Sequence, residues 1–301
     1  MSSNTKKLII LTAVILLLSF LMGRISDSFL PGIFSRNSSS GSGKTFPVSG
    51  SFSGIEISSK TDDVHFYNAG RQSAKVVWSG NSSMKLSVTA AGNTLKIREQ
   101  YKMPWFLRVG INTGKSEIAV YLPEKTYKEL DIKTDTGNVM IPAGFSFETV
   151  DIETDTGAVD FQGNVSRELN IRTDTGRITC AAVKPEKLSL ESDTGSVHVT
   201  DVSASKDIKI DTDTGKIVLK RVTAGSVMEI ESDTGSIELD HCDAGKIDIE
   251  SDTGSVTGTL LTGKIFIVKS GTGSVDVPAD SAGGECKIKT DTGKIMIRVG
   301  R

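Results

Sequence analysis

The stretch "LSLESDTGSVHV", residues 188–199, contains the tripeptide Asp193-Thr194-Gly195, which carries the catalytic carboxylate in pepsin-like aspartic proteases. Two such carboxylates suffice for a protease, whereas this chain of 301 residues repeats the tripeptide eight times. The Gly271-Thr272-Gly273 variant fills the one gap in the series. The eight copies begin at Asp135, Asp155, Asp174, Asp193, Asp213, Asp233, Asp252 and Asp291. The repetition has to be explained before any chemistry is assigned to it.

The spacing of these tripeptides is almost constant. The step from one glycine to the next is roughly 20 residues throughout and never varies by more than one residue. The glycines are Gly137, Gly157, Gly176, Gly195, Gly215, Gly235, Gly254, Gly273 and Gly293. A period this regular is typical of a solenoid, in which each repeat buries its apolar face against its neighbours. The sequence therefore predicts a stack of similar coils.

Apolar residues alternate with polar ones on both sides of each glycine. They stand seven and five residues before it and two and four residues after it, which predicts a half-buried strand on each side. A further apolar position seven residues after the glycine predicts a short third strand: Val183, Val202, Val222, Cys242 and Leu261. The pattern predicts an all-β fold, a right-handed parallel β-helix (β-solenoid) of about nine coils, each nineteen or twenty residues long.

The alternation changes parity at the tripeptide, so we expect the chain to turn a corner there. Glycine adopts the positive φ that a sharp corner needs, and an aspartate accepts hydrogen bonds from backbone amides two residues on. The Thr or Ser before each tripeptide is expected to stack on its equivalent in the next coil. The aspartates would stack as well and repel one another, an effect offset by basic residues just after three of the glycines: Arg177, Lys216 and Lys294.

A second acidic position precedes the glycine by four residues in four successive coils. With the tripeptide aspartates of the same coils it predicts an acidic strip: Glu191, Asp193, Asp211, Asp213, Glu231, Asp233, Glu250 and Asp252. Two interpretations remain open, a solvated acidic face, which we favour, and a site for Ca²⁺ or a cationic peptide. The GGxGxD pattern of calcium-binding β-rolls is absent from the sequence.

A protease would need two carboxylates that face each other and share a proton. Parallel coils instead place the aspartates in a row, and Thr or Ser precedes each tripeptide where pepsin-like enzymes have two apolar residues. No GxSxG motif occurs, and the three histidines have no metal-ligand spacing: His65, His198 and His241. We therefore assign no catalytic, cofactor-binding or metal-binding residue.

The N-terminal residues differ from the rest. Lys6 and Lys7 precede an apolar run over residues 8–22, which predicts a single-pass membrane anchor at residues 1–25 with its N-terminus in the cytoplasm. A signal peptide is the alternative, because an apolar run of this length also suits an h-region. Residues 26–45, which include "NSSSGSGK", have the composition of a flexible linker. The bulk of the chain is expected outside the cytoplasmic membrane.

Composition narrows the choice of partner. The formal net charge is -2, from 35 basic and 37 acidic residues, which argues against nucleic acid as a ligand. Three scattered cysteines are too few for a disulfide framework or a metal knuckle. All three fall on inward positions of the repeat and are expected to be buried, free thiols: Cys180, Cys242 and Cys286.

Residues 46–125 carry longer alternating segments before the repeats at 126–301 begin. Their order is a "GIEI" strand, a "DDVHF" strand, an "LKI" strand, a "VYLP" segment, and then repeated "LxIxTDTGxVxI" units. This order resembles the bacterial DUF4097 family of β-strand repeat proteins, also called "putative adhesins", with LiaG-like members. The resemblance implies a surface-exposed β-helical module, which some members of the family carry as single-pass proteins encoded with envelope-stress systems.

Two segments of the sequence suggest surfaces that contact other parts of the chain or a partner. Residues 101–106, "YKMPWF", gather Tyr101, Trp105 and Phe106, which we interpret as a cap over the first coil, with contact to membrane or glycan as the alternative. The last strand, residues 295–299, is expected to form an uncovered end coil through which the chain self-associates. Three basic residues could guard that edge by charge instead: Lys294, Arg298 and Arg301.

These observations predict a membrane-anchored, extracytoplasmic, adhesin-like β-helical module that binds or scaffolds and does not catalyse. An envelope or cell-surface protein, or a glycan, is the expected partner. One alternative is an accessory or sensory partner of a cell-envelope stress-response system. A more distant alternative is a carbohydrate-active β-helix enzyme, whose carboxylates could lie only in the acidic strip.

Overall fold

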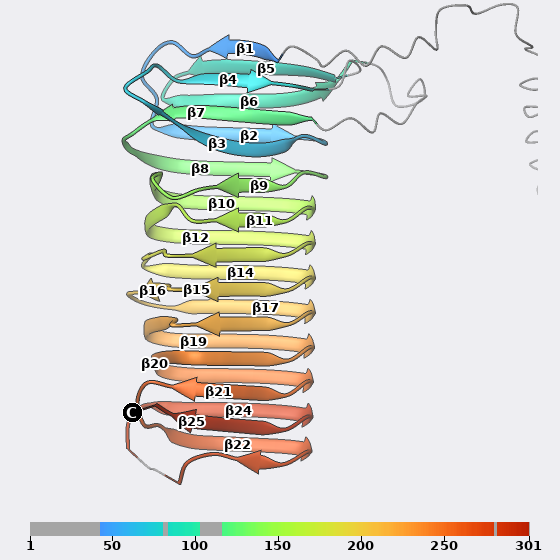
Figure 1. Cartoon of the computed structure of the whole chain (residues 1–301), viewed down its shortest axis with the longest axis vertical. Helices are drawn as coiled ribbons and strands as arrows, with labels where there is room; N and C mark the ends of the chain where they lie inside the picture. Colours follow the sequence, from blue (N-terminus) through green and yellow to red (C-terminus); the bar gives the residue numbers. More distant parts are fainter. Residues whose placement is uncertain (1–42, 81–83, 103–115, 280–281, 301) are drawn as a thin grey trace, which may run out of the picture. The chain divides into compact units, whose positions relative to one another are not determined.

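The computed structural model describes residues 43–80, 84–102, 116–279 and 282–300, and within these ranges every element is a β-strand (Figure 1). The described residues form a β-solenoid of about eight turns. No helix in this part of the chain is long and apolar enough to cross a membrane. The anchor predicted at residues 1–25 lies outside the described residues.

Two sheets line the solenoid, and most coils contribute one strand to each of them. Sheet B runs in the order β5, β6, β2, β8, β10, β12, β14, β17, β19, β20, β24, β22. In chain order, its strands are β2 Gly54–Ser59, β5 Met84–Ala91, β6 Thr94–Tyr101, β8 Thr126–Thr134, β10 Ser146–Thr156, β12 Asn164–Thr175, β14 Lys187–Thr194, β17 Ile208–Thr214, β19 Thr223–Thr234, β20 Ile237–Thr253, β22 Ile265–Thr272 and β24 Glu285–Thr292.

Sheet A runs in the order β1, β4, β7, β3, β9, β11, β13, β15, β18, β20, β21, β25, β23. Its remaining strands are β1 Lys44–Pro47, β3 Asp63–Gly70, β4 Lys75–Trp78, β7 Glu117–Pro123, β9 Val139–Ile141, β11 Val159–Phe161, β13 Ile178–Ala181, β15 Val197–Thr200, β18 Ile217–Lys220, β21 Val256–Leu260, β23 Val275–Asp276 and β25 Ile295–Val299. All pairings from β8 onward are parallel, as the repeat predicts, and nine tripeptide corners delimit eight turns.

The inward columns are those that the alternation predicts. Leu130, Ile132, Val139 and Ile141 of the first repeat are at most 1 % exposed, and their equivalents in later coils form one continuous core. The three cysteines are buried and free, and burial raises the pKa of each thiol, to about 11 for Cys242 and about 12 for the other two. The period of the repeat therefore predicts which side chains are buried and that they stack in columns along the solenoid.

The predicted third strand is real but short. β16, Ser203–Ala204, pairs with the start of β19, and the inward valines before it are buried as expected. Leu261 contradicts the prediction, since it is 45 % exposed and Leu260 takes the inward place beside Cys242. The reason is a bulge: β20 has two residues, Asp240 and His241, where β21 has one, so the register shifts there.

The tripeptide glycines are required by close stacking, and only three of the nine have the positive φ that we expected: Gly235, Gly273 and Gly293. A Cβ on any of the nine would lie 1.8–2.2 Å from the carbonyl oxygen of the equivalent residue in the neighbouring coil. Atoms cannot approach so closely, so only glycine fits at this coil spacing. The corner is therefore a place where two backbones touch.

The aspartates of the corner also differ from the prediction. The corner amides are already used in the ladder between coils, as when Gly195 N donates to Thr214 O at 2.9 Å. In the described part of the chain, no tripeptide carboxylate accepts a backbone hydrogen bond. The Thr or Ser before each aspartate is buried, as expected, and several of these hydroxyls donate to a glycine carbonyl of the neighbouring coil, as Ser192 does to Gly176 at 3.2 Å.

The order of coils in space departs from the order in sequence at both ends. The coil of β2 and β3 lies between the β6–β7 coil and the β8–β9 coil. At the other end, β24 and β25 lie between the β20–β21 coil and the β22–β23 coil (Figure 1). The prediction that residues 295–299 form the uncovered end was therefore wrong, because β25 has a partner on each side. The end coil consists of β22 and β23.

An aromatic cluster fills the first part of the core. Phe66 meets Phe145 with ring centroids 5.6 Å apart, and Tyr127 meets Phe52 at 6.0 Å and Phe147 at 5.9 Å. The hydrophobic rings come from β3, β8 and β10 and from nearby turns, so they tie the N-terminal strands to the first repeats. Of the expected aromatic cap, Tyr101 is 38 % exposed, whereas Trp105 and Phe106 lie outside the described residues.

Candidate functional site

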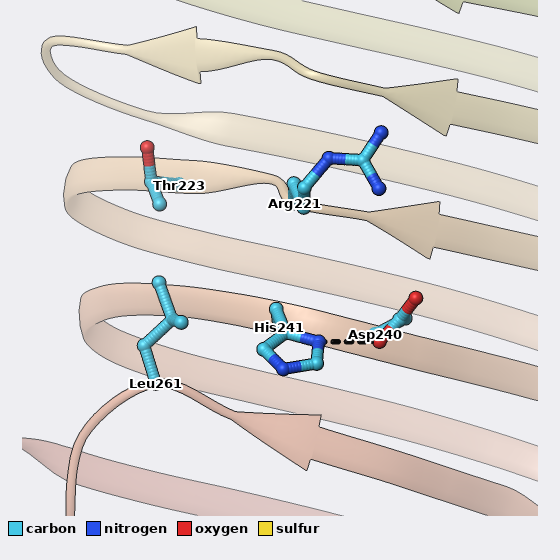
Figure 2. A pocket seen from close by; sticks show the side chains of 5 residues that line it. All are labelled: Arg221, Thr223, Asp240, His241 and Leu261. Carbon is cyan, nitrogen blue, oxygen red and sulfur yellow. Dashed lines mark hydrogen bonds and ion pairs between the residues drawn. The ribbon is translucent and has the colours of Figure 1, made fainter. Parts of the chain in front are cut away.

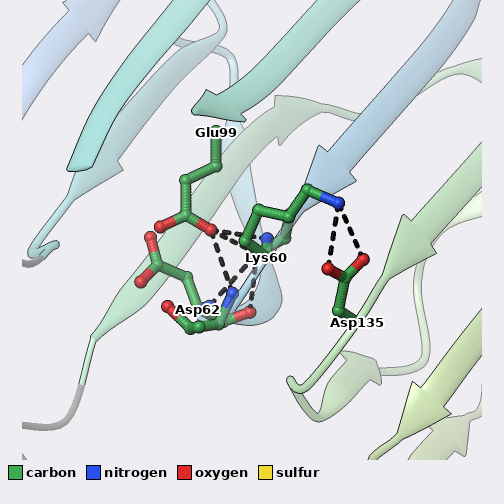
Figure 3. Close-up of polar contacts among 6 residues, drawn as sticks. Lys60, Asp62, Glu99 and Asp135 are labelled. Carbon is green, nitrogen blue, oxygen red and sulfur yellow. Dashed lines mark hydrogen bonds and ion pairs between the residues drawn. The ribbon is translucent and has the colours of Figure 1, made fainter. Parts of the chain in front are cut away.

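The tripeptide aspartates form one uninterrupted column on the solenoid. Because the coil of Asp291 is inserted beside that of Asp252, all eight stack in successive coils, and Gly271 of the end coil closes the column. At the other end stands Lys60, whose Nζ lies 2.9 Å from both carboxylate oxygens of Asp135 (Figure 3). The column is thus an acidic ridge with a cation at one end and a neutral residue at the other.

A parallel row of charges lies beside this ridge on the outer face of sheet B. Glu191, Asp211, Glu231 and Glu250 are paired in register across four adjacent strands. The row is closed by an ion pair at each end, Arg172 with Glu191 at 2.8 Å and Lys289 with Glu250. The acidic strip predicted from the sequence therefore exists as two adjacent rows of carboxylates.

Charge accumulates toward the middle of the strip. The pKa of Asp211 is raised by partial burial and by neighbouring carboxylates, and the pKa of Glu231 is raised for the same reasons. A hydrogen bond from Lys289 instead lowers the pKa of Glu250. Neighbouring anions disfavour the charged form of a carboxylate, and a basic side chain offsets this effect at each end of the row.

Two of the three basic residues expected to neutralise the ridge, Arg177 and Lys216, contact other groups instead, contrary to the prediction. Lys216 pairs with Glu238 at 2.6 Å, and Arg177 donates to Ser196 at 3.2 Å, both on the side of sheet A. Among the described residues, no group of three or more His, Cys, Asp or Glu side chains is placed to hold a metal ion. The side chains of Glu191 and Glu250 are 43 % and 42 % exposed, so the strip presents negative charge to solvent.

Two buried carboxylates lie where the ridge begins, and the sequence did not point to them. Asp62 is in register with the corner glycine Gly137, and Glu99 reaches in from β6 (Figure 3). Glu99 Oε2 accepts hydrogen bonds from the backbone N of Lys60 at 2.6 Å and of Thr61 at 3.1 Å. Asp62 Oδ2 accepts one from Trp78 Nε1 at 2.5 Å. The only sequence signal is a corner that reads Lys60-Thr61-Asp62 without a glycine.

The surroundings of this pair perturb the carboxyl group of Asp62. Burial first, and then the charge of Glu99, raises the pKa of Asp62 to about 6. One oxygen of each carboxylate has no hydrogen-bond partner in the described structure, and the two residues are at most 2 % exposed. Two neighbouring carboxyl groups are also the arrangement of an aspartic dyad, yet this pair is enclosed and lies outside the tripeptides.

A pocket of 520 Å³ opens at another corner of the solenoid (Figure 2). It lies where the bulge of β20 has no counterpart in β21, which leaves Leu261 outside the core. Four residues with left-handed φ between 53° and 59° lead up to it in successive coils: Ala182, Asp201, Arg221 and His241. The pocket is lined by Arg221, Thr223, Asp240, His241 and Leu261.

Carboxylates orient the two basic side chains of the pocket. Arg221 pairs with Asp201 through two contacts, at 2.5 and 2.8 Å, and His241 Nδ1 lies 2.5 Å from Asp240 Oδ1. The hydroxyl of Thr223 is engaged with Ser203 at 2.8 Å. A guanidinium and an imidazole, each paired with a carboxylate, can bind a small polar ligand. Sequence reasoning found no signal for this pocket.

The family model described as Toastrack DUF4097 matches residues 52–209 of the chain. The chain belongs to this family. Its match covers the N-terminal strands and the first repeats and includes the Asp62–Glu99 pair, whereas the pocket and the end coil lie beyond it. No curated protein matches the sequence.

Three solved structures are similar to this chain at low sequence identity. A "putative adhesin" from Parabacteroides distasonis is 12 % identical with a TM-score of 0.50, and the match covers 85 % of this chain and 96 % of that one. A "putative adhesin" from Bacteroides fragilis is 15 % identical with a TM-score of 0.49, over 85 % and 96 % of the two chains. A "putative cell adhesion protein" from Clostridium sporogenes is 12 % identical with a TM-score of 0.22, over 86 % and 99 %.

Proposed function

We propose that this DUF4097 protein is an adhesin-like binding scaffold, held outside the cytoplasmic membrane by an anchor at residues 1–25, and that it catalyses no reaction. Right-handed winding of the coils is part of the proposal, since parallel strands favour right-handed crossovers. The fold is that of a protein described as an adhesin, which supports the same class of function.

One observation carries the proposal. The described chain presents a straight strip of stacked carboxylates, which stand side by side in register from one coil to the next. A strip of this kind suits a cationic surface of an envelope or cell-surface partner, because its charges repeat along the solenoid. Asp211 and Glu231, whose pKa values are raised, mark its centre.

Crosslinking in intact cells tests the binding role, with the full-length anchored chain as bait. Neutralising the centre of the strip with Asp211→Asn and Glu231→Gln should reduce the captured partner at least fivefold, and added salt should weaken capture by the wild type. The matched control adds the same charge on sheet A through His198→Lys and Val218→Lys, which lie in adjacent coils. Equal capture by both double variants would exclude the strip as the binding surface.

Localisation and catalysis need separate tests. Fractionation should find the full chain in the membrane, and protease added outside the membrane should digest the solenoid. Turnover of a polysaccharide by the purified chain, abolished by Asp213→Asn with the fold intact, would assign an enzyme instead of a scaffold.

A further inference from the structure

The end coil, made of β22 and β23, differs from the coils above it in its outward residues. On the outer face of sheet B, the column through Glu229, Asp248 and Lys287 is charged until it ends at Ile267. The neighbouring column changes from Glu285 to Ile265 in the same step. Ile265 and Ile267 are 46 % and 52 % exposed, and Val275 of β23, which stands in the inward column of the buried Ile295, is 43 % exposed at the open end of that column. An apolar surface therefore appears where the charged columns stop.

Both strands of the end coil have a free edge. Within the described residues, β22 pairs only with β24 and β23 only with β25, so one row of backbone N–H and C=O groups on each strand has no strand partner. The inward residues Phe266, Val268 and Val277 are only partly buried, because no coil covers them from outside. Unpaired edges with apolar side chains are sites where further strands add.

The aspartate column does not oppose the approach of an identical end. The aspartate column stops one coil earlier, because Gly271 stands where every other corner of the column has a charged residue. Asp276 is held by Arg298 of β25. Two such ends would therefore meet without bringing two aspartate columns together at one coil spacing, a contact that like-charge repulsion would disfavour.

The geometry of the free edges of β22 and β23 indicates which kind of molecule binds at the end coil. An extended peptide pairs with one edge, whereas the end coil offers two edges on opposite sheets at the same level. A second end coil, related by a two-fold axis perpendicular to the solenoid axis, supplies both edges and meets them in antiparallel direction. We propose that the end coil is a dimerisation surface on which a second copy of this chain binds tail to tail.

The other end of the solenoid explains why the assembly closes. Its edge strands β1 and β5 are antiparallel to their neighbours, and neither exposes a large hydrophobic side chain. Head-to-tail stacking would bring this polar end against the isoleucines and would continue into filaments. Tail-to-tail pairing instead buries the apolar end on both copies and stops at two.

Cysteine crosslinking of the full-length chain in native membranes tests the dimer. Ile267→Cys places a reactive thiol at the proposed interface, while the three natural cysteines are buried. A short bismaleimide should convert this variant to a species of twice the 32.1 kDa chain mass. Met140→Cys is the matched control, since Met140 is also well exposed, at 45 %, but lies on β9, far along the stack. We expect at least tenfold more dimer for Ile267→Cys.

Two further variants separate pairing from misfolding. Ile265→Lys or Val275→Lys, each added to Ile267→Cys, should reduce the dimer band at least tenfold while circular dichroism and thermal melting stay unchanged. Dimer bands of equal strength for the two cysteine positions would overturn the proposal. A ladder above the dimer, a product with a different protein, or a folded Ile267→Cys chain that stays monomeric would overturn it as well.

Discussion

Gly195 stacks against Gly176 so closely that a Cβ on Gly195 would lie 1.8 Å from the carbonyl oxygen of Gly176. The contact recurs at every tripeptide corner, so it sets the approach of one coil to the next. Packing between backbones therefore requires the glycine of the tripeptide. The aspartate two residues before it is not needed for this packing and can contribute charge to the surface.

Substitution of this glycine should be costly. Gly195→Ala must push two coils apart, and we expect a loss of about 1–3 kcal/mol in the free energy of unfolding, measured by chemical denaturation. Gly300→Ala is the control, because a Cβ there meets nothing closer than 3.5 Å. Equal stability of the two variants would show that the corner relaxes without strain.

The buried pair Asp62–Glu99 should make stability depend on pH. The pKa of Asp62 is raised from 3.8 to about 6, so the folded state binds this proton more tightly than the unfolded chain does. The stabilisation is fully present below about pH 4 and is lost as the pH rises through 6.

Asp62→Asn tests this linkage, because the amide keeps a donor toward Glu99 at every pH. The variant should be more stable than the wild type at pH 8, by about 1–3 kcal/mol, and the difference should shrink toward pH 4. Thermal melting between pH 4 and 8 measures it. A difference that stays constant across this range would argue against a raised pKa of Asp62.

The aspartate ridge should contribute little to stability. The carboxylate of Asp213 accepts no backbone hydrogen bond in the described structure, so Asp213→Ala should change the free energy of unfolding by no more than about 0.5 kcal/mol, and in low salt the variant should be slightly more stable. Thr212→Ala is the comparison, since its buried hydroxyl donates to Gly195 O at 3.3 Å and its loss should cost about 1 kcal/mol. A larger effect at Asp213 than at Thr212 would restore the corner role of the aspartate.

A buried lysine fixes the segment that leads into the end coil. Lys264 is 3 % exposed, and its Nζ lies 2.6 Å from Asp243 Oδ1 and 2.8 Å from Ala244 O. Asp243→Ala leaves this ammonium group buried without its anion, which should cost about 3–5 kcal/mol. Hydrogen exchange should then accelerate in β22 and β24. Glu186→Ala, which breaks the exposed pair with Lys206, should leave stability and exchange in these strands nearly unchanged.

Some parts of the site were predictable and others were not. The acidic strip follows from the period, because residues at equal distances from a corner glycine must share a column. Asp62 and Glu99 come together only because β2 stacks between β6 and β8, a pairing of segments distant in the sequence that no local pattern encodes. The pocket beside His241 depends on a one-residue difference between β20 and β21, and a repeat whose length already varies by one residue hides such a difference.

The sequence by itself determined which side chains face the core, because alternation along a strand and a constant repeat leave one way to bury the apolar columns. The order of the coils was decided only by the tertiary structure. Every coil presents nearly the same inward pattern, so burial alone does not distinguish neighbours. The two ends of the solenoid supply the distinction. Lys60 begins the aspartate column and Gly271 closes it. The coil of β24 and β25, although last in the sequence, lies between the β20–β21 coil and the β22–β23 coil.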